Sequence, residues 1–168
     1  MAGTRIRRLA PPWRKLLLTT HIGASVGLLG TDATVLLLAV TGARGREPAA
    51  VYPAAQLIGS LVLVPAALLS LASGVLLGLL TPWGLFRHWW VTAKLALTTA
   101  GAVLSVVVLT PALAGAAAGG SVPSAQRLEL VRDSAAASVV LLVTLVRSVY
   151  KPFGRVRAVD RAVPAPRP

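Results

Sequence analysis

Four long apolar segments alternate with hydrophilic segments along this chain. They cover about residues 16–40, 54–80, 89–113 and 134–150. At a helical rise of about 1.5 Å per residue, each of the first three can cross a hydrocarbon core of about 30 Å. The fourth can cross if Arg147 extends its charged group toward the headgroups. Because open sheet edges are not tolerated in lipid, we predict an all-α polytopic membrane protein with a bundle of four transmembrane helices.

The segments between these runs complete the predicted organisation. Residues 41–53 and 115–124 are rich in Gly, Pro and Ala, which is typical of loops. Pro65 lies inside the second apolar segment, where we expect it to kink the helix without ending it. We therefore predict one membrane domain over residues 1–150. A basic, disordered cytoplasmic tail is expected over residues 151–168.

Composition agrees with the bilayer as the solvent, since 55% of the 168 residues are hydrophobic and 13% are charged. Cysteine is absent, which excludes disulfides, thiolate metal sites and cysteine nucleophiles. The net charge of +12 does not indicate nucleic-acid binding, because the basic residues flank apolar segments and form no patch on a folded surface. We expect no nucleic-acid partner.

Lysine and arginine are sorted between the two sides of the predicted bundle. The side that holds both termini carries 13 of them and the other side carries four. Because basic loops are retained in the cytoplasm, we predict a multi-pass plasma-membrane protein with cytoplasmic N- and C-termini. Tyr52 is expected at the opposite interface. A cleaved signal peptide is the alternative for the first apolar segment, which is longer than a signal sequence requires.

Asp32 is the charged residue that interrupts the first apolar segment. A carboxylate at this depth is costly unless it is protonated, paired or hydrated, which makes it a candidate functional residue. One interpretation is structural: a hydrogen bond to a Ser or Thr of another helix, or an ion pair with Arg132 at a comparable depth. The other interpretation is functional, with Asp32 binding a proton, an ion or a ligand.

Two histidines offer a different chemistry. His21 lies near the start of the first segment and His88 just before the third, both toward the predicted cytoplasmic face. Two imidazoles on different helices at similar depth are the minimum for a bis-histidine haem. The alternative is an interfacial histidine and a hydrogen-bonded packing histidine. With one interfacial and one packing histidine the protein holds no cofactor, whereas a bis-histidine site would require haem b.

Small residues recur at a spacing of four in the first two segments. Spacing by four places small residues on one helix face, where they allow two helix backbones to approach closely. We expect this pattern to serve packing within the chain, with a homodimer seam as the alternative. The residues are Gly23 and Gly27 in the first segment and Ser70, Gly74 and Gly78 in the second.

Basic and aromatic residues gather where the third segment begins: Arg87, Trp89, Trp90 and Lys94. Trp, Arg and Lys at an interface anchor a helix and contact anionic headgroups, so membrane lipids are the expected partners of this cluster. The sequence contains no phosphate-binding glycine loop, no metal-spaced cluster and no plausible Ser-His-Asp set. Hydrolytic and phosphoryl-transfer chemistry is therefore not expected, and the catalytic and metal-ligating residues are predicted to be none.

Three stretches resemble an uncharacterised family of small actinobacterial integral membrane proteins, a domain of unknown function. They are HIGASVG at 21–27, TPWGLFRHWWVTAKL at 81–95 and VYKP at 149–152. The resemblance implies four helices and a bacterial plasma membrane but no activity. The chain departs from the pattern at Leu28, where an aromatic residue is common, and Asp32 is not part of it. A looser similarity to copper-resistance and b-type cytochrome four-helix proteins rests on architecture alone.

These observations favour a non-enzymatic plasma-membrane protein that acts as an interaction or accessory subunit. It could bind a second copy of itself or another membrane protein. The first alternative is a small redox protein with haem between His21 and His88. The second is proton- or ion-coupled transport that uses Asp32.

Overall fold

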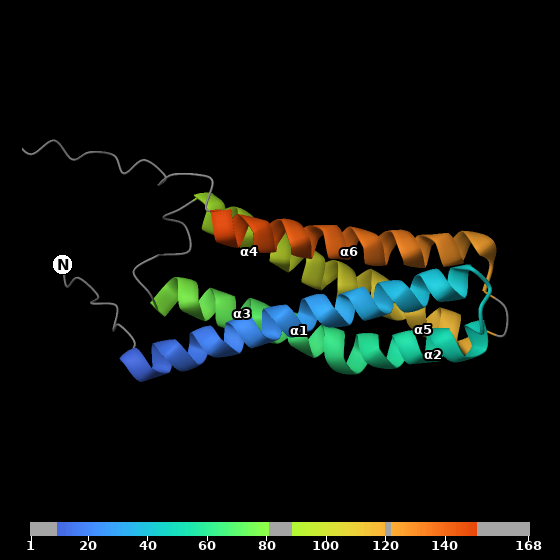
Figure 1. The fold of residues 1–168 in the computed structure, drawn as a ribbon, viewed down its shortest axis with the longest axis horizontal. Helices are drawn as coiled ribbons and strands as arrows, with labels where there is room; N and C mark the ends of the chain where they lie inside the picture. Colours follow the sequence, from blue (N-terminus) through green and yellow to red (C-terminus); the bar gives the residue numbers. More distant parts are fainter. Residues whose placement is uncertain (1–9, 81–88, 120–121, 151–168) are drawn as a thin grey trace, which may run out of the picture.

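The computed structural model describes residues 10–80, 89–119 and 122–150, and it excludes the side chains at 89–91, 94, 149 and 150. These residues form four long helical rods and no strand (Figure 1). Two of the rods each contain a π-helical segment. The elements, rod by rod, are α1 (Pro11–Ala43); α2 (Pro48–Ile58), η1 (Gly59–Leu63) and α3 (Val64–Leu80); α4 (Trp89–Leu104), η2 (Ser105–Leu109) and α5 (Thr110–Ala118); and α6 (Ser124–Tyr150).

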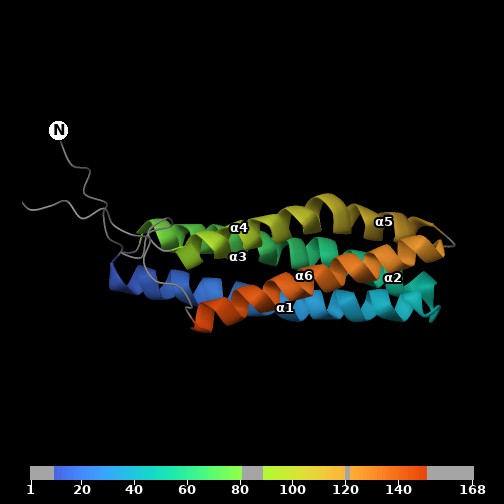
Figure 2. The same ribbon diagram turned by 90° about the horizontal axis from the view of Figure 1, so that it is seen from above.

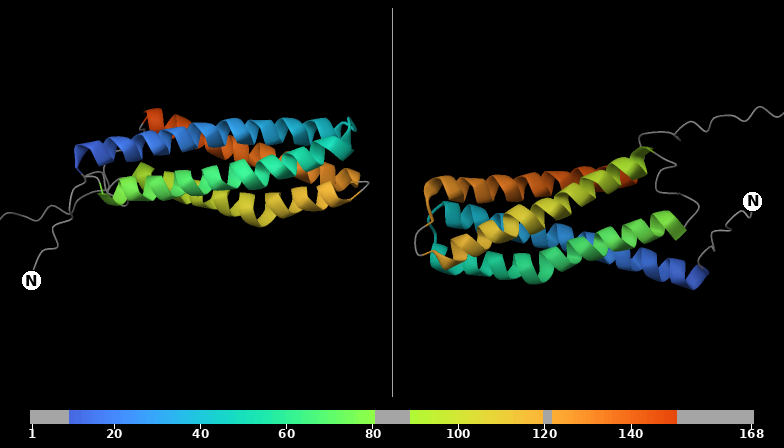
Figure 3. Two further views of the ribbon diagram at one scale, coloured as in Figure 1. Left: turned by 90° about the horizontal axis from the view of Figure 1, so that it is seen from below. Right: turned by 180° about the vertical axis from the view of Figure 1, so that it is seen from behind.

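The four rods lie side by side, each antiparallel to the next in sequence. At one end, called here the terminal end, lie the start of α1, the end of α3, the start of α4 and the end of α6 (Figures 1 and 2). At the other end, the loop end, α1 turns into α2 and α5 leads to α6 (Figure 3). α1 packs against α2, α3 and α6, and α2 packs against α5. The predicted four-helix arrangement is present.

The turn between α1 and α2 is much shorter than the predicted loop. It contains residues 44–47, with Gly45 at φ 75° and Glu47 at φ 42°. Gly45 donates its backbone N–H to Gly42 over 2.9 Å, which closes the end of α1. Pro48 then opens α2, a position where its missing N–H is not needed. The predicted loop 41–53 is wrong at both ends, because α1 continues to Ala43 and Pro48 already starts α2.

Proline explains the π-helical segments. Pro65 and Pro111 each follow the last residue of a π segment by two positions. A proline ring clashes with the carbonyl four residues earlier, and the wider π turn moves that carbonyl aside. The Thr110 N–H accordingly bonds to Ser105 O, five residues back. The Thr110 hydroxyl donates to the same oxygen over 2.7 Å. The kink expected at Pro65 is thus a π segment just before it.

Among the described residues, three helical stretches are long and apolar enough to cross a membrane: Pro11–Ala43, Pro48–Leu80 and Leu95–Ala118. α6 is not among them, and four charged residues lie within its first ten positions. It nevertheless begins at Ser124, ten residues before the predicted start. Large apolar side chains cover the outside of the bundle, including Leu37, Leu61 and Val107, each at least 65% exposed. The architecture is therefore a helical bundle of membrane type, with three helices long and apolar enough to span a bilayer and a fourth, more polar helix.

The core is narrow and built from small or branched residues. Each rod contributes to it, and α1 contributes mainly through the half nearer the loop end, since its first seventeen residues include none that is fully buried. The fully buried apolar side chains include Val35, Ala39, Tyr52, Ala55, Leu63, Leu109, Leu113 and Leu130.

Candidate functional site

Asp32 lies in the centre of the bundle. Its side chain is 1% exposed, and the Ser138 hydroxyl of α6 donates a hydrogen bond to Asp32 Oδ2. These two residues are 106 positions apart, so their bond joins the first rod to the last. A buried carboxylate is stabilised by such a donor, because an unsatisfied polar group in a core costs about 1–3 kcal/mol. The first structural interpretation, a hydrogen bond to a serine of another helix, is the one found.

Arg132 does not pair with Asp32. Its guanidinium Nε donates to Asp133 Oδ1 over 3.1 Å, and its side chain is 71% exposed. Arg132 precedes Ser138 by six residues, or about 9 Å along α6, which keeps the guanidinium away from the Asp32 level. No described cation forms an ion pair with Asp32. The expected Asp32–Arg132 pair is therefore wrong, and Asp32 has a neutral hydroxyl as its partner.

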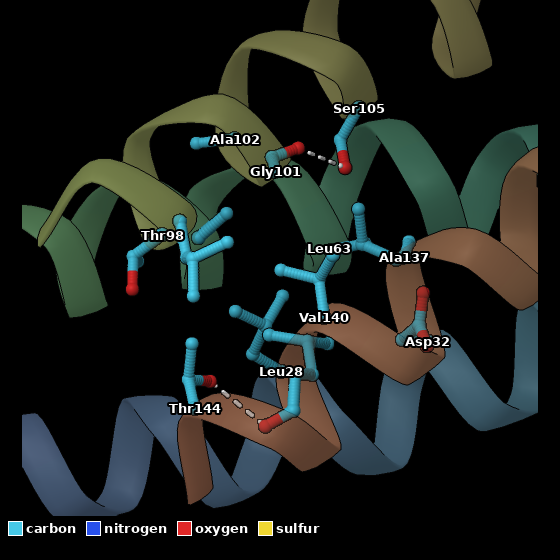
Figure 4. Close-up of a pocket in the computed structure, with 13 residues that line it drawn as sticks. Leu28, Asp32, Leu63, Thr98, Gly101, Ala102, Ser105, Ala137, Val140 and Thr144 are labelled. Atoms are coloured by element: carbon cyan, nitrogen blue, oxygen red, sulfur yellow. Dashed lines mark hydrogen bonds between the residues drawn. The ribbon is translucent and has the colours of Figure 1, made fainter. Parts of the chain in front are cut away.

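A small cavity adjoins Asp32 between α1, α4 and α6 (Figure 4). Its volume is about 20 Å³, and η1, η2 and α3 also contribute to its wall. A cavity must offer roughly 10–15 Å³ to hold one water molecule, so this one has room for a single water. Most of the wall is aliphatic, and the polar lining residues are Asp32, Thr98, Ser105 and Thr144.

The hydroxyls of this cavity are already held by nearby backbone. Ser105 donates to Gly101 O over 2.9 Å, and Thr144 donates to Leu141 O over 2.8 Å. A hydroxyl that donates in this way still has lone pairs to accept a bond. Asp32 is the only ionisable residue among those that line the cavity. The arrangement can hold water and a proton, but it offers no nucleophile with a base.

His21 belongs to a second polar cluster, between α1 and α3 and nearer the terminal end. Its Nδ1 lies 3.0 Å from Ser70 O and 3.1 Å from Ser73 Oγ. Because a carbonyl can only accept, Nδ1 carries the hydrogen. Ser25 and Ser70 share a further bond of 2.8 Å between their hydroxyls. The cluster ties α1 to α3, as expected for a hydrogen-bonded packing histidine.

Gly74 makes room for the imidazole ring. A Cβ built at Gly74 would lie 3.1 Å from His21 Cε1, closer than nearly all real Cβ contacts. The small residues of α3 thus serve packing within the chain, as predicted, and Ser70 and Gly78 are buried. Gly23 and Gly27 do not share this role. Both are exposed, and no atom lies within 4 Å of a Cβ built at either of them.

Several predicted site residues fall outside what the structure describes. His88 and Arg87 lie outside the described residues, so the distance between His88 and His21 is not described. Trp89 and Trp90 open α4 and Lys94 follows in its second turn, but only their backbone is described. The predicted tail over 151–168 also lies outside the described residues. The haem ligand pair and the lipid-anchor cluster remain predictions.

Two buried hydroxyls have no signal in the sequence. Tyr52 OH and Ser134 Oγ are both buried, and neither has a hydrogen-bond partner among the described residues. Tyr52 was expected at an interface, but its side chain is 1% exposed and lies against Gly42 of α1. A Cβ at Gly42 would lie 2.7 Å from the Tyr52 ring, so glycine is required there.

Comparison of the chain with protein-family models, with curated proteins and with solved structures gave no match.

Proposed function

We propose that this chain is a four-span protein of a bacterial plasma membrane that acts as a non-enzymatic interaction or accessory subunit. The observation that carries the proposal is how its buried polar side chains are used. Asp32 bonds to Ser138 across α1 and α6, and His21 bonds to Ser70 and Ser73 across α1 and α3. Polar groups inside a membrane bundle that bond to one another hold helices together.

The fourth span rests on the packing of α6. This helix has 27 residues, about 40 Å of length, and it packs against both α1 and α4. Leu130, Ser134 and Ala137 are buried on its inner face, while Val139, Val146 and other large apolar residues are exposed. A helix that lies along two apolar spans shares their membrane depth. Its charged first turns would then lie at the headgroups of the loop end.

The orientation follows from the charge sorting. The terminal end would face the cytoplasm, where the basic termini and the cluster of Arg87, Trp89, Trp90 and Lys94 would contact anionic headgroups. A phosphatase reporter that is active only outside the cytoplasm tests this. We expect it to be silent at the C-terminus and active when inserted after Gly45. An active C-terminal fusion would overturn either the fourth span or the orientation.

The accessory role predicts that the chain is not alone in its membrane. After mild solubilisation, the 17.3 kDa chain should migrate on native gels in a complex larger than one copy in its detergent micelle. Mass spectrometry of that band would separate a homo-oligomer from a complex with another membrane protein. Migration as a single copy from native membranes would overturn the accessory role.

A redox role is the second candidate, and one contact favours it. Histidines that bind iron usually donate their other ring N–H to a carbonyl, and His21 Nδ1 donates to Ser70 O in this way. Haem would then be bound through His21 Nε2, with His88 as the second ligand, and would supply one-electron chemistry. Protein purified in detergent after haem supplementation gives the test. A Soret band lost in His21→Ala would establish this role, and its absence would remove it.

A further inference from the structure

Asp32 sits in an environment that does not stabilise a negative charge. Its side chain is 1% exposed, its partner Ser138 is a neutral hydroxyl, and the adjoining cavity is lined mainly by Leu, Val and Ala. A single hydroxyl does not replace the hydration that an ionised carboxylate loses on burial, which is worth several kcal/mol. A neutral carboxylic acid avoids that cost. It also gains an O–H group that must itself find an acceptor.

No ion pair joins Asp32 to a described charged group on the surrounding elements. Arg147 of α6 lies nine residues beyond Ser138, about 14 Å along the helix, and the side chain of Lys94 on α4 is outside the described residues. Residues 54–80 contain no ionisable side chain, nor do residues 95–118, so η1, α3, η2 and α5 bring none. On α6, Arg132 pairs with Asp133, and Arg127 donates to Val122 O over 2.8 Å. His21 shares α1 with Asp32 but is eleven residues away, or about 16 Å along the helix.

The cavity supplies the acceptor for the acid proton. Its 20 Å³ accommodates one water molecule, and Asp32 forms part of its wall. Ser105 and Thr144 can each accept a bond from that water, because their own hydrogens are donated to backbone carbonyls. A buried water usually makes about three hydrogen bonds. Asp32, Ser105 and Thr144 are three polar residues of the wall that can take part in them.

We infer that Asp32 is a buried proton-binding site, which holds its proton in the packed bundle, shares it with a water in the adjacent cavity, and releases it when α1 and α6 separate. Release leaves the carboxylate on Asp32 and passes the proton to water. Opening of the α1–α6 contact is thereby coupled to proton release, and rising pH favours the open form. This inference rests on the side chains in the core of the bundle. It is independent of the proposed accessory role and of the proposed haem binding.

The chain offers a direct test because it has only five acidic side chains. Replacing the other four, as Glu47→Gln, Glu129→Gln, Asp133→Asn and Asp160→Asn, leaves Asp32 as the sole side-chain carboxyl without changing it. Infrared spectra of this variant in lipid at neutral pH should show the C=O stretch of a protonated acid. The band should shift in D₂O and disappear in Asp32→Asn. Carboxylate bands in its place would overturn the inference.

A second variant tests the water. Gly101 lines the cavity, and a Cβ built there would lie 3.8 Å from Val140 Cγ1, an ordinary contact. Gly101→Ala therefore fits and fills part of the cavity, so the acid band should move to the frequency of a carboxyl with one hydrogen bond fewer. Gly30→Ala, which has open space, is the matched control. An acid band that is the same in both variants would overturn the role of the water.

A third measurement tests proton release through protein stability. From neutral to alkaline pH, the unfolding midpoint of the wild type in detergent should decrease more than that of Asp32→Asn. About one proton should be released for each molecule that unfolds. Parallel pH dependence in the two proteins would contradict coupled release. Failure of this test leaves the topology and complex-formation tests unaffected, so the two proposals are separable.

Discussion

Two serines one turn apart on α6 show how much depends on a single partner. Ser138 donates to Asp32, whereas Ser134 is fully buried with no hydrogen-bond partner among the described residues. The sequence could identify Asp32, because it is the charge in an otherwise apolar segment. It could not identify Ser138, because which serine of α6 faces Asp32 depends on the rotation of a helix 106 residues away. Tyr52 was wrongly predicted at an interface because aromatic residues suit both interfaces and cores.

The two serines give a matched pair of substitutions. Ser138→Ala removes a donor from a buried carboxyl and should destabilise the protein by about 1 kcal/mol, the typical value of a hydrogen bond between membrane helices. Ser134→Ala removes an unsatisfied hydroxyl and should be neutral or slightly stabilising. Reversible unfolding in mixed micelles measures both. Equal effects would mean that the Asp32–Ser138 bond contributes no net stability.

Glycines in α1 allow a second comparison at this scale. Gly42→Ala would place a methyl group 2.7 Å from the Tyr52 ring and should destabilise by about 1–3 kcal/mol, since the core has no room to give. Gly27→Ala has open space and should stabilise by up to about 1 kcal/mol through helix propensity. Tyr52→Leu in the Gly42→Ala background should restore part of the loss. Absence of any rescue would place the strain elsewhere.

At the scale of elements, the π segments were the least predictable feature. A deviation was predicted at Pro65, and the structure has a second one at Pro111, for which no prediction was made. Whether the deviation is a kink or a wider turn depends on which groups take up the displaced carbonyls. At η2 the Thr110 hydroxyl and N–H both bond to Ser105 O. Such local bonds belong to the folded backbone and leave no periodic signal.

The origin of η2 can be tested by removing its cause. Pro111→Ala supplies an N–H that can bond to the carbonyl four residues earlier, so the segment should become regular α-helix. Hydrogen exchange of the amides at 105–111 in nanodiscs should then slow several-fold. Pro48→Ala is the control, because a first-turn N–H has no helical partner. Unchanged exchange at 105–111 would mean that packing against α6, not proline, fixes the π turn.

At the scale of the whole molecule, the number and order of the helices could be predicted and their lengths could not. The hydrophobic pattern identifies uncharged runs, whereas helices continue into charged turns. α6 begins ten residues early because Arg127, Glu129, Arg132 and Asp133 are all compatible with a helix. α5 likewise extends to Ala118 through a stretch of Ala and Gly. Charged residues therefore do not mark where a helix begins or ends.

The absence of native cysteine makes the topology measurable by labelling. Single cysteines at Glu47 and Pro123 should react with a membrane-impermeant maleimide in intact cells, because both lie at the loop end. A cysteine at Pro168 should react only after the membrane is permeabilised. If α6 does not cross, the cysteines at 123 and 168 will react together. That result would leave a three-span protein with its C-terminus outside.

The two π segments also have a consequence for how the length of this chain can change. A π turn holds one residue more than the α-turn it replaces, and residues 106–108 of η2 all face outward. Loss of one residue there would restore an ordinary helix and leave the packed faces on either side in phase. The same deletion elsewhere in a rod would rotate everything beyond it by about 100° and turn buried positions toward lipid. Single-residue deletions should therefore be tolerated in η1 and η2 and lethal to the fold in α1.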